Sequence, residues 1–166
     1  MTRSWVAVVA IVIAAASIGG WRLGEARRAA TAEWTVIEVL DGDTIRVERD
    51  GSGEALTDTV RLLGVDTPET HHPRKPVECF GPEAAAYTQA RLGDRRVQLE
   101  ADIEARDRYG RRLAYVIVDG ERFNDELLRR GYARLLVIEP NRAHARAMLQ
   151  EELGAKRAGR GLWGEC

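Results

Sequence analysis

The sequence has only two cysteines among its 166 residues, Cys79 and Cys166, and they lack the C-x-x-C spacing of zinc and redox sites. It also has no Gly-rich nucleotide-binding loop, no Ser-His-Asp arrangement, no internal repeat and no low-complexity tract. These absences argue against zinc-thiolate and serine-hydrolase chemistry. The two cysteines fit an exported protein, in which two states are open: a disulfide that ties the C-terminus to the loop at Cys79, or two free thiols.

The chain also lacks an excess of positive charge. Its formal net charge is −1, from 25 basic and 26 acidic residues. Residues 1–30 contain four arginines and one glutamate, which leaves 21 basic and 25 acidic residues in the rest of the chain. A mildly acidic domain cannot bind nucleic acid through bulk charge, because nonspecific affinity comes from cations that neutralise phosphates. Any such activity must therefore use a local arginine cluster and a metal ion.

One long uncharged run stands at the N-terminus, from Trp5 to Trp21, after a short positive start at Arg3. Three interpretations are open: a cleaved signal peptide, an uncleaved membrane anchor, or a buried core helix. We expect a signal peptide or anchor over residues 1–21, a polar tether over residues 22–33 and a folded domain over residues 34–166. The corresponding location is outside the cytoplasm, as a secreted or periplasmic protein, or tethered to the membrane by this segment.

The remaining sequence predicts a mainly β domain with helices, of the α+β class. Alternating apolar residues and turn signals predict five strands, and longer periodic segments predict three helices. The strands cover residues 34–39, 44–48, 56–63, 96–101 and 112–118, and the helices cover residues 84–92, 123–130 and 142–156. Residues 64–78 form a long polar loop with three prolines, and loops of this length are usually functional. This pattern favours a five-stranded OB-fold barrel with about three helices, preceded by an N-terminal apolar helix.

Three short runs place polar side chains next to strand ends: DGDT at 41–44, RLLGVDTPET at 61–70 and RDRYGRRLAY at 106–115. Asp43 and Asp66 are the best metal-ligand candidates, because two carboxylates with carbonyls and waters suit Ca²⁺ or Mg²⁺ rather than Zn²⁺. Either aspartate considered alone is more simply a turn former. The set considered together favours a hard cation held beside a phosphodiester.

Further candidates supply acid–base and phosphate chemistry. Glu69 follows a proline in the long loop and can act as the general base for a metal-bound water; the alternative is a solvated loop glutamate. Arg61 and Arg111 can grip phosphate oxygens in a bidentate way and stabilise charge that develops on phosphorus. Because the chain has 23 arginines, Arg106, Arg108 and Arg112 carry little weight on composition alone.

Together these runs resemble those of the thermonuclease family, the staphylococcal-nuclease-like domains. The resemblance extends from about Trp34 to Trp163 and includes the segments TPETHHPRKPVECFGPEA and FNDELLRRGYA. It implies an OB-fold barrel with three helices and Ca²⁺-dependent hydrolysis of DNA and RNA that leaves 3′-phosphate ends. We expect a monomer.

The resemblance also implies a role for each matching residue. Asp43 and Asp66 would bind Ca²⁺ through carboxylates and Thr67 through its main-chain carbonyl, with Asp41 beside these ligands. Glu69 would orient or deprotonate the attacking water. Arg61 and Arg111 would hold the scissile phosphate and stabilise the transition state, and Arg108 and Tyr109 would contact neighbouring phosphates.

The sequence departs from the family where tyrosines stack on a base. The matching stretch, residues 135–139, reads LLVIE and has no aromatic side chain. Stacking on an aromatic platform is worth roughly 1–3 kcal/mol per base, so we expect nucleotide binding weaker by about one to two orders of magnitude, with the chemistry intact. Two rival functions remain: a noncatalytic module at the cell envelope that binds nucleic acid or protein, and an envelope protein with a different phosphodiester substrate.

Overall fold

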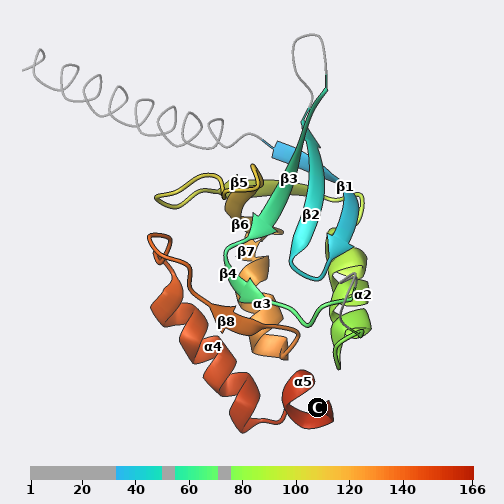
Figure 1. Cartoon of the computed structure of the whole chain (residues 1–166), viewed down its shortest axis with the longest axis vertical. Helices are drawn as coiled ribbons and strands as arrows, with labels where there is room; N and C mark the ends of the chain where they lie inside the picture. Colours follow the sequence, from blue (N-terminus) through green and yellow to red (C-terminus); the bar gives the residue numbers. More distant parts are fainter. Residues whose placement is uncertain (1–32, 50–54, 71–75) are drawn as a thin grey trace, which may run out of the picture. The chain divides into compact units, whose positions relative to one another are not determined.

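The computed structural model describes residues 33–49, 55–70 and 76–166 (Figure 1). The strands are β1 (Glu33–Asp41), β2 (Thr44–Arg49), β3 (Leu56–Leu62), β4 (Gly64–Asp66), β5 (Arg96–Glu100), β6 (Arg112–Val118), β7 (Glu121–Arg122) and β8 (Arg134–Leu136). The helices are α2 (Gly81–Leu92), α3 (Phe123–Arg130), α4 (Ala145–Arg157) and α5 (Leu162–Glu165). The expected N-terminal apolar helix and the segment over residues 1–21 lie outside the described residues.

Five of these strands close into a barrel. Neighbouring strands follow the order β3-β2-β1-β5-β6-β7, and a further pairing of β3 with β6 joins the two sides. The β3–β6 pairing is parallel and the other pairings around the barrel are antiparallel. Alternate side chains point into a common core, in which Val36, Ile45, Val60 and Val116 are fully buried. The predicted OB-fold barrel with packed helices is confirmed.

A second, two-stranded sheet lies where the sequence predicted only loop. β4 pairs with β8 in an antiparallel register that places Gly64 opposite Leu136 and Asp66 opposite Arg134. Strands of three residues carry no measurable alternation, and these partners lie far apart in the sequence. This pairing fixes Asp66 at the end of a strand.

The helices lie close to their predicted ranges. α3 matches its prediction and ends at Gly131, which has the positive φ of 78° that a glycine adopts at such an end. α2 begins at Gly81, before the predicted start, with Pro82 in its first turn. α4 begins at Ala145 rather than at the predicted Arg142, and the Ala143 N–H, just before the helix, donates to the Asp102 carboxylate.

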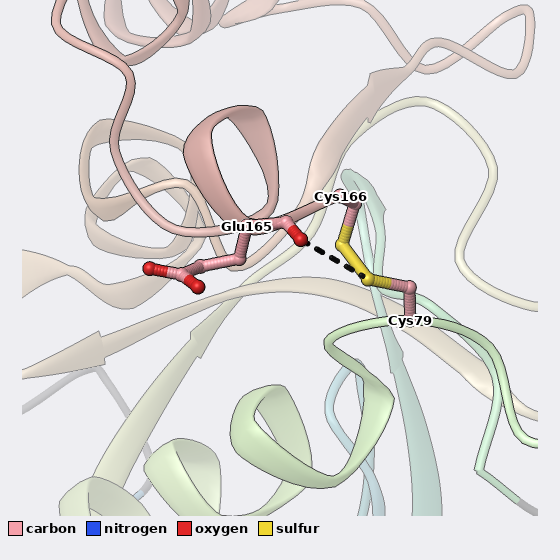
Figure 2. The surroundings of a disulfide bond; sticks show 3 residues. All are labelled: Cys79, Glu165 and Cys166. Carbon is pink, nitrogen blue, oxygen red and sulfur yellow. Dashed lines mark hydrogen bonds between the residues drawn. A yellow bond between two sulfur atoms is a disulfide. The ribbon is translucent and has the colours of Figure 1, made fainter.

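The C-terminal tail is folded against the domain and bonded to it. The Leu162 N–H donates to the Gly131 carbonyl, and the Leu162 side chain is buried at the start of α5. Cys166 forms a disulfide with Cys79, which lies 87 positions earlier in the sequence, and their Cα atoms are 6.0 Å apart (Figure 2). The dashed line in Figure 2 joins Cys79 Sγ to the Glu165 carbonyl oxygen at 3.9 Å; a disulfide sulfur carries no hydrogen, so this is a close contact. Of the two cysteine states left open by the sequence, the structure contains the disulfide.

Within the part of the chain that the structure describes, no helix combines the length and apolar character needed to cross a membrane.

Candidate active site

An ionic cluster joins the ends of three strands. Arg61, near the end of β3, lies opposite Thr44 in the β2–β3 register, and Asp43 directly precedes Thr44. Arg61 Nη2 is 3.0 Å from Asp43 Oδ2 and 3.2 Å from Asp66 Oδ1. The Arg61 guanidinium therefore bridges Asp43 and Asp66, the two carboxylates that the sequence predicts as metal ligands. We call Asp43, Arg61 and Asp66 the site cluster.

Main-chain contacts fix the Arg61 side chain from behind. Its Nη1 donates to the carbonyls of Leu62 at 2.8 Å and Val65 at 2.7 Å. The side chain is 13% exposed, so it has little freedom to rotate away. The contacts with two carbonyls and two carboxylates hold the positive charge of the guanidinium in one place, so binding of an oxyanion beside it would cost little further side-chain entropy.

Thr67 lies directly against Asp43. Its N–H donates to Asp43 Oδ2 at 3.1 Å, and its side chain packs over Gly42, where an added Cβ would meet Thr67 Oγ1 at 2.7 Å. Only glycine therefore fits at the centre of this turn. Thr67 Oγ1 is buried and lacks a hydrogen-bond partner among the described residues. An oxygen with unused lone pairs therefore lies next to the site cluster.

Asp41 and Glu69 adjoin the site cluster. Asp41 Oδ1 accepts hydrogen bonds from the Gly42 N–H at 2.8 Å and the Thr70 hydroxyl at 3.0 Å. Burial raises the pKa of Asp41; these two bonds oppose the rise, while hydrogen bonding with Glu69 and the charge of Asp43 add to it. Asp43 and Glu69, from two separate segments, thus both disfavour the charged form of Asp41, and a nearby cation would relieve this effect.

Arg111 is held by a residue that the sequence reasoning missed. Asp107 accepts the N–H of Tyr109 at 2.9 Å and that of Arg111 at 3.0 Å through Oδ1, and Arg111 Nε at 2.7 Å through Oδ2. Burial acts to raise the pKa of Asp107, but these donors outweigh it and lower the pKa. Asp followed by Gly110 in a tight turn is the local signal that would have identified this role.

A cavity of about 480 Å³ connects the two arginines. Its lining combines the polar residues Arg61, Arg108, Tyr109 and Arg111, the acidic residues Glu104 and Asp107, and aliphatic residues that include Leu136 and Ile138. The Tyr109 ring is 69% exposed and lies 4.8 Å from Arg108 Cζ and 5.6 Å from Arg111 Cζ. The lining therefore offers arginines for a phosphate and aliphatic side chains for an apolar ring.

The residues fit a hard divalent cation. Burial raises the pKa of Asp66, the charge of Asp43 raises it further, and Arg61 opposes both. The described residues contain no group of three or more His, Cys, Asp or Glu side chains suited to a metal. Two carboxylates would therefore need main-chain carbonyls, water and substrate oxygens to complete a shell, which suits Ca²⁺ and its six to eight oxygen ligands.

Two of the arginines given little weight in the sequence analysis form ion pairs outside the site cluster. Arg106 and Arg112 both pair with Asp58, at 2.7 and 3.0 Å. The structure therefore separates these arginines into a group that lines the cavity (Arg61, Arg108 and Arg111) and a pair that binds Asp58 and does not line it.

This arrangement is typical of one class of protein, the OB-fold phosphodiesterases: strand ends bring carboxylates and arginines together beside a cavity. Comparison with known proteins agrees. Residues 59–165 match the family of staphylococcal nuclease homologues. The thermonucleases of Staphylococcus hyicus and Staphylococcus intermedius are each 41% identical to the chain over 130 residues, which cover 78% of this chain and 75% of each relative. Endonuclease YncB of Bacillus subtilis is 40% identical over 131 residues, or 78% of this chain and 60% of the relative.

The chain belongs to the staphylococcal nuclease family and is a nuclease.

Proposed function

We propose that this nuclease requires Ca²⁺, hydrolyses both DNA and RNA, and leaves 3′-phosphate and 5′-hydroxyl ends. The site cluster carries the proposal: Arg61 lies within 3.2 Å of two carboxylates and also lines the cavity that contains Arg111. The same guanidinium thus connects the place for a cation with the place for a phosphate.

Asp43, Asp66 and the Thr67 carbonyl would hold the cation. When bound, Ca²⁺ would supply positive charge beside a phosphodiester oxygen and a coordinated water. The unused lone pairs of Thr67 Oγ1 and the mutual repulsion of the carboxylates support a cation at this place.

The chain's own residues would perform the remaining work. Arg61 and Arg111 would bind the non-bridging oxygens of the scissile phosphate and stabilise the charge that develops there. Glu69 would orient the attacking water or accept its proton, while the phosphorus–O5′ bond breaks in line with the attack and the departing O5′ takes a proton from solvent to become the 5′-hydroxyl. Arg108 and Tyr109, at the exposed side of the cavity, would contact neighbouring phosphates.

A plasmid-degradation assay on the full-length chain tests this function. We expect cleavage with Ca²⁺, none with a chelator, and 3′-phosphate ends that block polymerase extension until a phosphatase removes them. Glu69→Ala should lose most of the turnover while its thermal unfolding stays close to that of wild type. Full turnover in the chelator, or in Glu69→Ala, would refute the mechanism; binding without cleavage would favour the noncatalytic module.

We also propose that the protein works outside the cytoplasm as a monomer. The uncharged run from Trp5 to Trp21 and the Cys79–Cys166 disulfide support this location, because disulfides persist in oxidising compartments. Fractionation of the cells that produce it would test the location and would distinguish a released protein from a membrane-tethered one. Activity confined to the cytoplasm would contradict the proposal.

A further inference from the structure

The segment that carries Glu69 is paired with a second segment nine positions later. The Glu78 N–H donates to the Glu69 carbonyl at 2.9 Å, and the Glu69 N–H donates to Glu78 Oε2 at 3.2 Å. These two bonds engage both main-chain groups of Glu69. The orientation of the Glu69 side chain therefore depends on where Glu78 is held.

Close packing holds the start of α2 against the same backbone. A Cβ at Gly81 would lie 2.9 Å from the Glu69 carbonyl oxygen and 3.1 Å from that of Pro68. The Gly81 N–H in turn donates to the Glu78 carbonyl at 3.0 Å. Phe80, between them, stacks on Tyr132 at 5.4 Å between ring centroids. Residues 78–81 therefore form a support behind Glu69.

The disulfide attaches this support to the docked C-terminal tail. Cys79, next to Glu78, is bonded to Cys166 at the end of α5 (Figure 2). The tail itself is fixed, because Gly161 and Gly131 approach so closely that a Cβ at Gly161 would lie 2.3 Å from the Gly131 carbonyl oxygen. The bond thus connects the Glu69 support to the end of α3, a rigid part of the domain.

We propose that Glu78 is a positioning residue for Glu69 and that the Cys79–Cys166 disulfide holds Glu78 in place, so that reduction of this bond slows turnover. This inference rests on the proposed role of Glu69 in the reaction. The nuclease would then work at its full rate only where the disulfide can form, and would be slower in a reducing compartment.

The redox step is a thiol–disulfide exchange. A dithiol reductant gives two electrons and two protons to the Cys79–Cys166 bond, which becomes two thiols, and the reductant becomes a cyclic disulfide. The bond is at the surface of the domain, next to a cavity of about 710 Å³ that includes Cys79, so a small reductant can reach it.

The first test compares oxidised and reduced full-length protein with Ca²⁺ and DNA. We expect reduction to lower kcat by about tenfold and to change KM little, because a misplaced catalytic group costs rate more than binding. The Cys79→Ser variant should show the same lower kcat and no response to the reductant. Hydrogen exchange at the amides of Glu69 and Glu78 should become faster on reduction, which measures the support without using activity.

The second test keeps the disulfide and changes Glu78. We expect Glu78→Ala to lower kcat with little change in KM, and Glu78→Gln to restore it, because an amide oxygen still accepts the Glu69 N–H. Glu83→Ala, which removes an exposed carboxylate in the first turn of the same helix, is the matched control and should keep the wild-type kcat. These variants test the positioning role even if the reduced protein unfolds.

Epistasis with Glu69 separates positioning from general loss of structure. In the Glu69→Gln variant, reduction should change the residual kcat much less than in the wild type, because the support acts through Glu69. An equal loss in both backgrounds, or no loss in the wild type, would overturn the proposal while leaving the proposed function intact. If the oxidised wild type shows no Ca²⁺-dependent cleavage, the proposed function itself fails.

Discussion

Two residues of β3, Asp58 and Arg61, each belong to an ionic cluster, and the two clusters have opposite ratios of arginines to carboxylates. In the site cluster, one arginine, Arg61, serves two carboxylates. In the second cluster, which we call the Asp58 cluster, one carboxylate receives Arg106 through two hydrogen bonds and Arg112 through one. The first has an excess of negative charge and the second an excess of positive charge.

The pKa shifts follow from this difference. In the Asp58 cluster, burial acts to raise the pKa of Asp58, but the hydrogen bonds from the two arginines outweigh it and lower the pKa. In the site cluster, burial and the charge of Asp43 raise the pKa of Asp66 against the effect of Arg61. The Asp58 cluster is therefore complete as the chain folds, whereas the site cluster would gain stability from a cation. An ion pair alone does not mark a site, whereas an excess of carboxylates around an arginine that lines a cavity marks a candidate site.

The largest expected effect is a loss of kcat when the site cluster, but not the Asp58 cluster, loses an arginine. Arg61→Ala should lower kcat by about 10²–10³-fold, the usual cost of losing one donor to a developing oxyanion. Arg112→Ala, which removes an arginine from the Asp58 cluster, should keep kcat close to wild type. Steady-state cleavage of DNA with saturating Ca²⁺ measures both, with thermal unfolding as the check on folding. If the two variants lose activity equally, the distinction between the clusters is wrong.

Calcium should distinguish the clusters by stability. A ligand that binds only the folded state at 100 times its Kd stabilises that state by about 2.7 kcal/mol. We expect Ca²⁺ to raise the thermal unfolding midpoint of the wild type and of Asp58→Asn by similar amounts, and that of Asp43→Asn by much less. Calorimetry with and without Ca²⁺ makes the comparison within each variant, so that any intrinsic destabilisation by Asp43→Asn cancels. An undiminished shift in Asp43→Asn would place the cation elsewhere.

The two clusters also differ in how much of them the sequence could predict. Asp43, Arg61 and Asp66 stand in short runs with turn residues and strand flanks, so their convergence at strand ends followed from local patterns. α3 and its end at Gly131 were predictable for the same reason, since amphipathic spacing and a terminal glycine are local signals. Nothing local indicated that Arg106 and Arg112 would share Asp58, because these partners are about fifty positions apart.

Other features depend on long-range contacts in the same way. β4 and β8 are too short for a periodic pattern, and each exists only because the other lies beside it. The support at Glu78 was likewise hidden, since a polar loop residue next to a cysteine has no distinctive pattern. The disulfide was left open between two states, because cysteine spacing does not reveal whether two positions lie within bonding distance.

The pH dependence of stability should reveal the Asp58 cluster. A lowered folded-state pKa stabilises the protein above the unfolded pKa of about 3.9, and this contribution disappears as the pH falls through the folded value. Asp58→Asn should therefore destabilise the protein by about 1.5–3 kcal/mol at pH 7, the usual range for hydrogen bonds to charged groups. The difference from wild type should shrink once the pH falls below the unfolded pKa. Urea unfolding at several pH values measures it, and a constant difference would mean that Asp58 keeps an ordinary pKa.

The smallest expected effect is a change in nucleotide affinity when a tyrosine is introduced next to each cluster. Arg61 of the site cluster lines the cavity whose lining also includes Leu136, which is 37% exposed. Leu136→Tyr should strengthen the binding of a mononucleotide inhibitor about tenfold, because an aromatic ring there can stack on the base. Thr57→Tyr, which adds the same ring to an exposed position next to Asp58, should leave the affinity unchanged. Calorimetric titration with Ca²⁺ present measures both. An equal gain in the two variants would show that an added tyrosine binds the nucleotide nonspecifically, and that the cavity beside the site cluster does not select the base.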